Sequence, residues 1–159
     1  MSATRATKSL AACLLLACTD ASASAPQPLA TAEGEATGSL SLHLGGFRSA
    51  EGQALIAVYR GEDGFPGDPG RAWKKFAMKI AGDRVSVDLP GVPVGEYAAV
   101  VVHDENGNND LDTNWLGIPR EGVGASNNAK GRMGPPRWRD ARFTVTAAGA
   151  VQRITLTYL

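Results

Sequence analysis

Apolar residues recur at every second position along most of the chain after residue 38, and this alternation constrains the fold more than any other feature. Successive side chains of a β-strand point to opposite faces, so a period of two indicates strands with one buried face. The predicted strands cover residues 40–44, 54–59, 75–80, 84–89, 97–102, 142–145 and 153–158. Residues 69–75 could form a short helical turn, and no long helix is predicted.

Seven short antiparallel strands predict an all-β fold, a β-sandwich of the transthyretin-like or immunoglobulin-like type. A turn at Gly82 should join residues 75–80 and 84–89 in a hairpin. Residues 54–59 and 97–102 are apolar throughout, which predicts central strands covered on both faces. Tyr97 follows a turn at Gly95, as in a tyrosine corner, where the hydroxyl binds nearby backbone; an ordinary core tyrosine is the alternative.

Residues 1–25 have the organisation of an export signal, with basic Arg5 and Lys8, an apolar segment at 10–17 and small residues at 21–25. Residues 15–18 also resemble a bacterial lipobox, in which Cys18 would be acylated and become the mature N-terminus. Both interpretations stay open. Each predicts an exported protein of the bacterial periplasm or outer membrane, with a lipid anchor at Cys18 in the second case.

Residues 26–37 have little apolar content and predict a flexible linker, which leaves residues 38–159 as the folded domain. Cys13 and Cys18 both fall within the predicted signal, which excludes thiol catalysis and cysteine-bound zinc in the mature domain. Lys plus Arg and Asp plus Glu number 16 each, which argues against a general nucleic-acid binder. The apolar runs are too short to predict a transmembrane span.

One connection, residues 103–140, is far longer than an ordinary turn between strands, and we call it the insertion. Long connections without regular structure are uncommon in compact domains and are usually functional or disordered. Trp115, Ile118 and Trp138 could anchor the insertion, so we expect it to be ordered. We expect a functional site here, beside the glycine-rich residues 61–70.

The first part of the insertion carries oxygen-bearing side chains at every second position. They are Asp104, Asn106, Asn108, Asp110 and Asp112. Alternate oxygens on a tightly wound loop can converge on calcium, as in an EF-hand. Asn109 stands where an EF-hand has its glycine and Trp115 where it has its bidentate glutamate, so Glu121 would have to supply that ligand. The alternative is a metal-free loop in which Asp and Asn side chains cap the local backbone.

Further candidates for a site in the insertion are His103, Asn127 and Asn128. His103 ends a predicted strand and could serve as a metal ligand or a base. Two histidines cannot form a three-histidine zinc site, and Ser126 lacks the GxSxG pattern of a serine hydrolase. The residues therefore assign no catalytic group.

The strings HDENGNNDLD and GIPREGVGASNNA, with the segment GFPGDP before them, resemble a family of exported bacterial proteins, domain of unknown function 2141. The resemblance covers about residues 38–159. It implies a signal-bearing envelope protein with a transthyretin-like or immunoglobulin-like sandwich, and it implies no catalytic residues.

Three functions fit these observations. The first is a non-catalytic exported β-sandwich that binds an envelope ligand or partner through residues 103–140, with calcium ordering the insertion. The second is a metal-assisted periplasmic hydrolase that uses His103, Asp104 and Glu121. The third is a structural or adhesive module.

Overall fold

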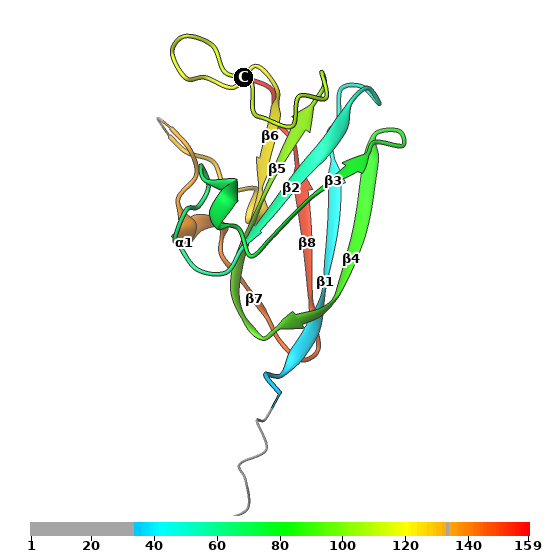
Figure 1. The fold of residues 1–159 in the computed structure, drawn as a ribbon, viewed down its shortest axis with the longest axis vertical. Coiled ribbons are helices and arrows are strands. Elements are labelled where there is room, and N and C mark those ends of the chain that lie inside the picture. Colours follow the sequence, from blue (N-terminus) through cyan, green and yellow to red (C-terminus); the bar gives the residue numbers. More distant parts are fainter. Residues whose placement is uncertain (1–33, 133) are drawn as a thin grey trace, which may run out of the picture. The chain divides into compact units, whose positions relative to one another are not determined.

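A computed structural model describes residues 34–132 and 134–159. The predicted export signal, both cysteines and most of the predicted linker lie outside the described residues. The described part forms eight strands and three short helices (Figure 1). The strands are β1 (Thr37–Gly45), β2 (Gln53–Tyr59), β3 (Lys74–Lys79), β4 (Arg84–Pro93), β5 (Gly95–Asp104), β6 (Gly122–Ala125), β7 (Phe143–Val145) and β8 (Ala150–Thr155). The helices are η1 (Pro69–Arg71), η2 (Ser126–Asn128) and α1 (Trp138–Ala141), and none of the described helices is long and apolar enough to cross a bilayer.

The strands form two sheets, so the prediction of an all-β fold is confirmed. One sheet has the order β4-β1-β8; the other has the order β3-β2-β5-β6, with β7 also paired to β5. The alternating residues Leu40, Leu42 and Leu44 of β1 are buried in one core with Ile56 of β2 and Val101 of β5. This core is where the hydrophobic effect stabilises the fold, because apolar area from both sheets is removed from water there.

The strand count and two features of the strand pairing differ from the prediction. β6 lies within the insertion as an eighth strand, and β1 and β8 run parallel rather than antiparallel. The hairpin predicted across Gly82 does not form, because β3 pairs with β2 while β4 pairs with β1. Alternation identifies which side chains of a strand are buried, but both sheets bury their inner faces in the same core, so it cannot identify the partner strand.

The tyrosine corner is confirmed. The side chain of Tyr97 is buried, and its hydroxyl donates a hydrogen bond of 2.8 Å to the carbonyl oxygen of Pro93. At the same end of the domain, Thr37 pairs with Pro93, and the backbone N–H of Val94 donates to the carbonyl of Ala36. The insertion leaves β5 at the opposite end, after Asp104 (Figure 1).

The outer face of the larger sheet is also apolar. Paired residues of antiparallel strands share a face, and two cross-strand rows lie on this side of the sheet. The rows are Ala77, Leu55, Val102 and Val123, and Lys75, Ala57, Val100 and Ala125. A second small core of Tyr59, Ala98, Ala125, Trp138 and Ala141 covers one end of this face. The first row is left open to form part of the site described next.

Candidate functional site

Asp104, the last residue of β5, is an entirely buried carboxylate that caps the start of the insertion. Its Oδ1 accepts hydrogen bonds from the backbone N–H groups of Gly107 (2.8 Å) and Asn108 (3.1 Å). Its Oδ2 accepts from the backbone of Asn109 (2.9 Å) and the side-chain amide of Gln53 (2.8 Å). Burial alone would raise the pKa of Asp104, but these hydrogen bonds favour the ionised form and hold its pKa below the ordinary value.

Asn106, Asn108 and Asp112 bind one another on the exposed side of this turn. The amide nitrogens of Asn106 and Asn108 donate to the two carboxylate oxygens of Asp112 at 2.6 Å and 3.1 Å. The amide oxygens accept backbone N–H groups two residues ahead, at 2.9 Å and 2.8 Å. Asp110 accepts from the backbone of Leu111. These contacts show that Asp and Asn side chains cap the local backbone, as the second interpretation of this pattern expects.

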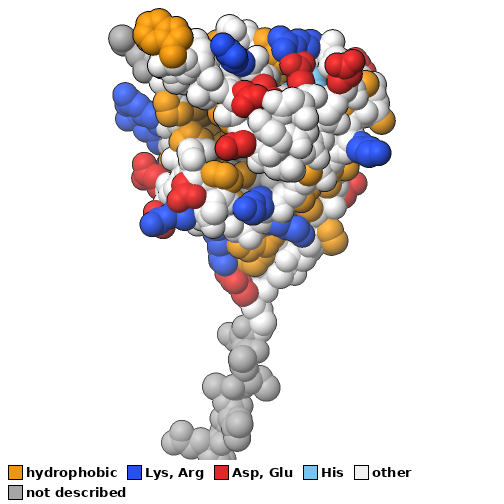
Figure 2. Space-filling view, turned by 45° about the horizontal axis from the view of Figure 1, so that its top comes forward, with side chains coloured by type: hydrophobic (Ala, Val, Ile, Leu, Met, Phe, Trp, Pro, Cys, Tyr) orange, Lys and Arg blue, Asp and Glu red, His pale blue; other side chains and the backbone are white. Residues whose placement is uncertain are grey.

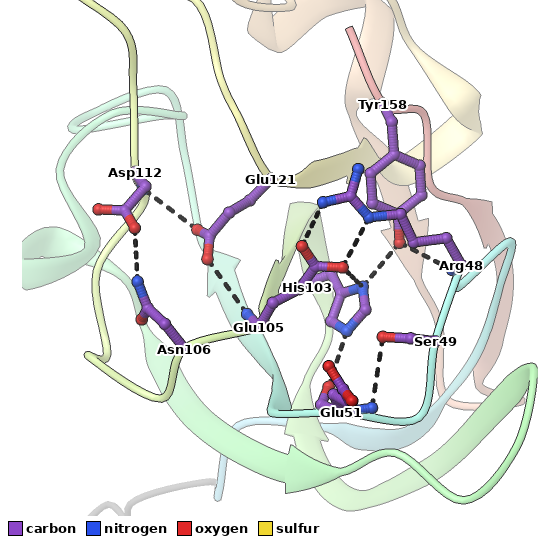
Figure 3. A network of polar contacts seen from close by, with 9 residues as sticks. All are labelled: Arg48, Ser49, Glu51, His103, Glu105, Asn106, Asp112, Glu121 and Tyr158. Carbon is purple, nitrogen blue, oxygen red and sulfur yellow. Dashed lines mark hydrogen bonds and ion pairs between the residues drawn. The ribbon is translucent and has the colours of Figure 1, made fainter.

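Glu121 joins the beginning and the middle of the insertion (Figure 3). It is almost fully buried, and its two carboxylate oxygens accept the backbone N–H groups of Glu105 and Asp112, both at 3.1 Å. Five of the six predicted calcium ligands are therefore brought into one hydrogen-bonded cluster, with Asp110 at its edge. Among residues 34–132 and 134–159, no three His, Cys, Asp or Glu side chains form a group that could hold a metal ion.

His103 is entirely buried, and both of its ring nitrogens are engaged (Figure 3). Nε2 lies 2.9 Å from the carbonyl oxygen of Glu51, which can only accept, so the hydrogen bonds assign the proton to Nε2. Nδ1 then accepts from the hydroxyl of Tyr158 at 2.7 Å, and this hydroxyl accepts the backbone N–H of Arg48 at 3.0 Å. These two contacts fix the orientation of the ring within the fold.

Arg48 and Glu105 cover this histidine from the solvent side. Their side chains form a two-pronged ion pair, and the guanidinium carbon of Arg48 lies 4.6 Å from the centre of the Tyr158 ring. The hydrogen bond from Arg48 holds the pKa of Glu105 below its ordinary value. The sequence alone does not indicate that Arg48, Gln53 and Tyr158 belong to this cluster, since no spacing within the insertion points to residues in other segments.

Asn127 and Asn128 anchor the insertion to neighbouring segments. Both adopt left-handed backbone, with φ of 57° and 51°, a conformation that asparagine tolerates better than most residues. The amide of Asn127 donates to the carbonyl of Arg142 at 2.8 Å, and the side-chain oxygen of Asn128 accepts the N–H of Thr155 at 2.8 Å. The structure thus gives both residues a positioning role.

A groove of about 1270 Å³ lies over the outer face of the larger sheet. Its floor includes Leu55, Val102 and Val123, which are half-buried. The insertion contributes Leu116 and Ile118 to the lining. In Figure 2, hydrophobic side chains gather in a hollow that is bordered by charged side chains. The groove and the capped turn that begins at Asp104 form the candidate site.

The tip of the insertion is a fixed turn that exposes apolar side chains. The side-chain oxygen of Asn114 accepts the backbone N–H groups of Leu116 (2.9 Å) and Ile118 (3.0 Å). Trp115 is 90% exposed, so the prediction that it anchors the insertion is wrong. Trp138 does anchor it, because its ring is buried against Phe65 with the ring centres 5.7 Å apart.

The chain was compared with curated proteins, solved structures and protein families. No curated protein and no solved structure matches it. The model of one family, described as "uncharacterized protein conserved in bacteria", matches residues 42–153, a span that contains the insertion and most of both sheets. The chain therefore belongs to this family, domain of unknown function 2141.

Proposed function

We propose that this protein is an exported, non-catalytic binding module of the bacterial cell envelope, and that the groove holds an apolar ligand. The observation that carries the proposal is the apolar outer face of the larger sheet. An antiparallel sheet with one face in the core ordinarily presents polar residues on the other face. Here Leu55, Val102 and Val123 occupy that face beneath a groove. Contiguous apolar surface of this kind marks binding sites.

The contacts within the insertion support its role as one side of a binding groove better than a role as a catalytic centre. His103, Asp104 and Glu121, the residues of the hydrolase hypothesis, are buried, and their polar atoms bind other protein groups. A general base needs access to the substrate proton that it removes. The apolar residues Leu116 and Ile118, by contrast, line the groove. The insertion therefore supports recognition of a ligand better than hydrolysis.

Binding of a neutral fluorescent probe tests this proposal. N-phenylnaphthylamine gains fluorescence in apolar surroundings, and titration with the protein should produce a saturable increase with one probe per chain. A competing apolar ligand should reverse the increase. Fluorescence that rises linearly without saturation, or that is equal with urea-unfolded protein, would contradict a specific groove.

Calcium ordering of the insertion is a second proposal, supported by the backbone of Asn109. Its φ of 65° is left-handed, as suits the position that glycine occupies in an EF-hand. If calcium binds the folded protein, an excess of 100- to 1,000-fold over Kd should raise the free energy of unfolding by about 3–4 kcal/mol. Thermal melting in calcium, in magnesium and in chelator measures this effect. Identical melting temperatures would leave the self-capped loop as the whole explanation of the Asp and Asn pattern.

A further inference from the structure

We infer that the groove binds a long-chain carboxylate, with the apolar chain on the sheet and the carboxylate at a basic rim; this inference rests on the proposed function. Four charged side chains line the groove, and three of them are cationic. They are Lys75, Lys130, Arg132 and Asp110. Lys75 lies on β3 at one edge of the floor, whereas Lys130 and Arg132 belong to the segment that follows η2. The lining therefore combines an apolar floor with an excess of positive charge.

The three rim cations are available for a ligand. None of the ion pairs found within residues 34–132 and 134–159 involves Lys75, Lys130 or Arg132. Several other arginines of the domain are paired, such as Arg48 with Glu105 and Arg71 with Asp63 at 2.6 Å. Unpaired cations beside an apolar surface attract an anionic headgroup and orient it, because an ion pair at the edge of an apolar site is less screened than one in open water.

The charge balance of the rim favours a single negative charge on the ligand. Asp110 lines the same groove and would repel a doubly charged phosphate more strongly than a carboxylate. The guanidinium of Arg132 can bind a carboxylate through two parallel hydrogen bonds. The floor formed by Leu55, Val102 and Val123 offers no hydrogen-bonding side chain, which suits a hydrocarbon chain.

Displacement of N-phenylnaphthylamine by ligands of matched chain length tests the inference. The competitors are a dodecanoate, the corresponding alcohol and the corresponding alkyl phosphate, each kept below its micelle concentration. The carboxylate should displace the probe at a concentration about tenfold lower than the alcohol, as expected for one charge-assisted contact. Equal displacement by the alcohol would overturn the inference, and stronger displacement by the phosphate would overturn the choice of a carboxylate.

A double variant, Lys130→Gln with Arg132→Gln, tests whether these two cations bind the carboxylate of the ligand. It should lose the preference for the carboxylate while it binds the neutral probe and the alcohol as the unaltered protein does. The matched control is Lys79→Gln with Arg84→Gln, which removes two exposed cations that do not line the groove. A preference that survives in the rim variant would overturn the role of these residues. Failure of the proposed function is distinguishable, since the unaltered protein would then not bind the probe at all.

Discussion

Replacing Asp104 by alanine should lower the free energy of unfolding by about 3 kcal/mol, because the change leaves several donors in a buried place without an acceptor. The carboxylate is entirely buried and accepts the backbone N–H groups of Gly107, Asn108 and Asn109. It also accepts the side-chain amide of Gln53 at the start of β2. Urea denaturation at neutral pH, followed by far-ultraviolet circular dichroism, measures the loss.

Asp110→Ala is the matched control for this substitution. Asp110 is exposed, and its carboxylate accepts the N–H of the next residue, Leu111, at 2.8 Å. Its removal should change the free energy of unfolding by no more than about 0.5 kcal/mol. If the two substitutions have equal effects, the number of acidic residues in the insertion, and not the capping hydrogen bonds of Asp104, determines its stability.

The pH dependence of stability follows from the same carboxylate. The pKa of Asp104 is lower in the folded protein than in the unfolded chain, so its contribution is fully present above the unfolded pKa of about 4. The contribution is lost as the pH falls through the lower folded pKa. Asp104→Asn should therefore flatten the acid limb of a stability-against-pH curve. An unchanged acid limb would assign that limb to other groups, such as Glu105.

Placing an arginine on the groove floor should lower the affinity for N-phenylnaphthylamine about a hundredfold, because a guanidinium among apolar side chains must either lose its hydration or fill the groove. Val102 is the position to change, since it lies between Leu55 and Val123 in the open cross-strand row. It is half-buried, so the new side chain can reach water and the fold should persist.

Val151→Arg makes the same substitution on the other sheet. Val151 lies on β8 and is 53% exposed, and it does not line the groove. This variant should bind the probe like the unaltered protein, with a similar free energy of unfolding. Retained binding by Val102→Arg would place the probe elsewhere and remove the support for the groove.

The sequence predicts the buried faces of the strands well, because burial and alternation have the same physical cause. It predicts β1 and β5 and the tyrosine corner at Tyr97, yet not the parallel pairing of β1 with β8. That pairing depends on how the chain crosses between the sheets, and no local pattern records it. The apolar segments 54–59 and 97–102 predict strands that are covered on both faces. In the structure, the second small core covers one end of the outer face, and the groove leaves the rest of that face open.

In the polar part of the candidate site, the local contacts could likewise be predicted from the sequence, whereas the long-range contacts could not. Asp and Asn in alternation predict a loop that caps its own backbone, and the local contacts of Asn106, Asn108 and Asp112 follow from their spacing. The contacts of Gln53 with Asp104 and of Tyr158 with His103 join residues more than 50 positions apart. Such contacts depend on the tertiary fold, as does the exposure of Trp115.

The two ends of the described chain lie at different distances from the groove, and this matters for handling the protein in the laboratory. β1 begins at the end of the domain opposite to the insertion (Figure 1), where Thr37 pairs with Pro93. Leu159, by contrast, is part of the groove lining. An affinity tag or a surface linkage joined directly to residue 34 would start at the end of the domain opposite to the insertion. A tag fused after Leu159 would compete for the same space, so tagging at that position would itself mask the site.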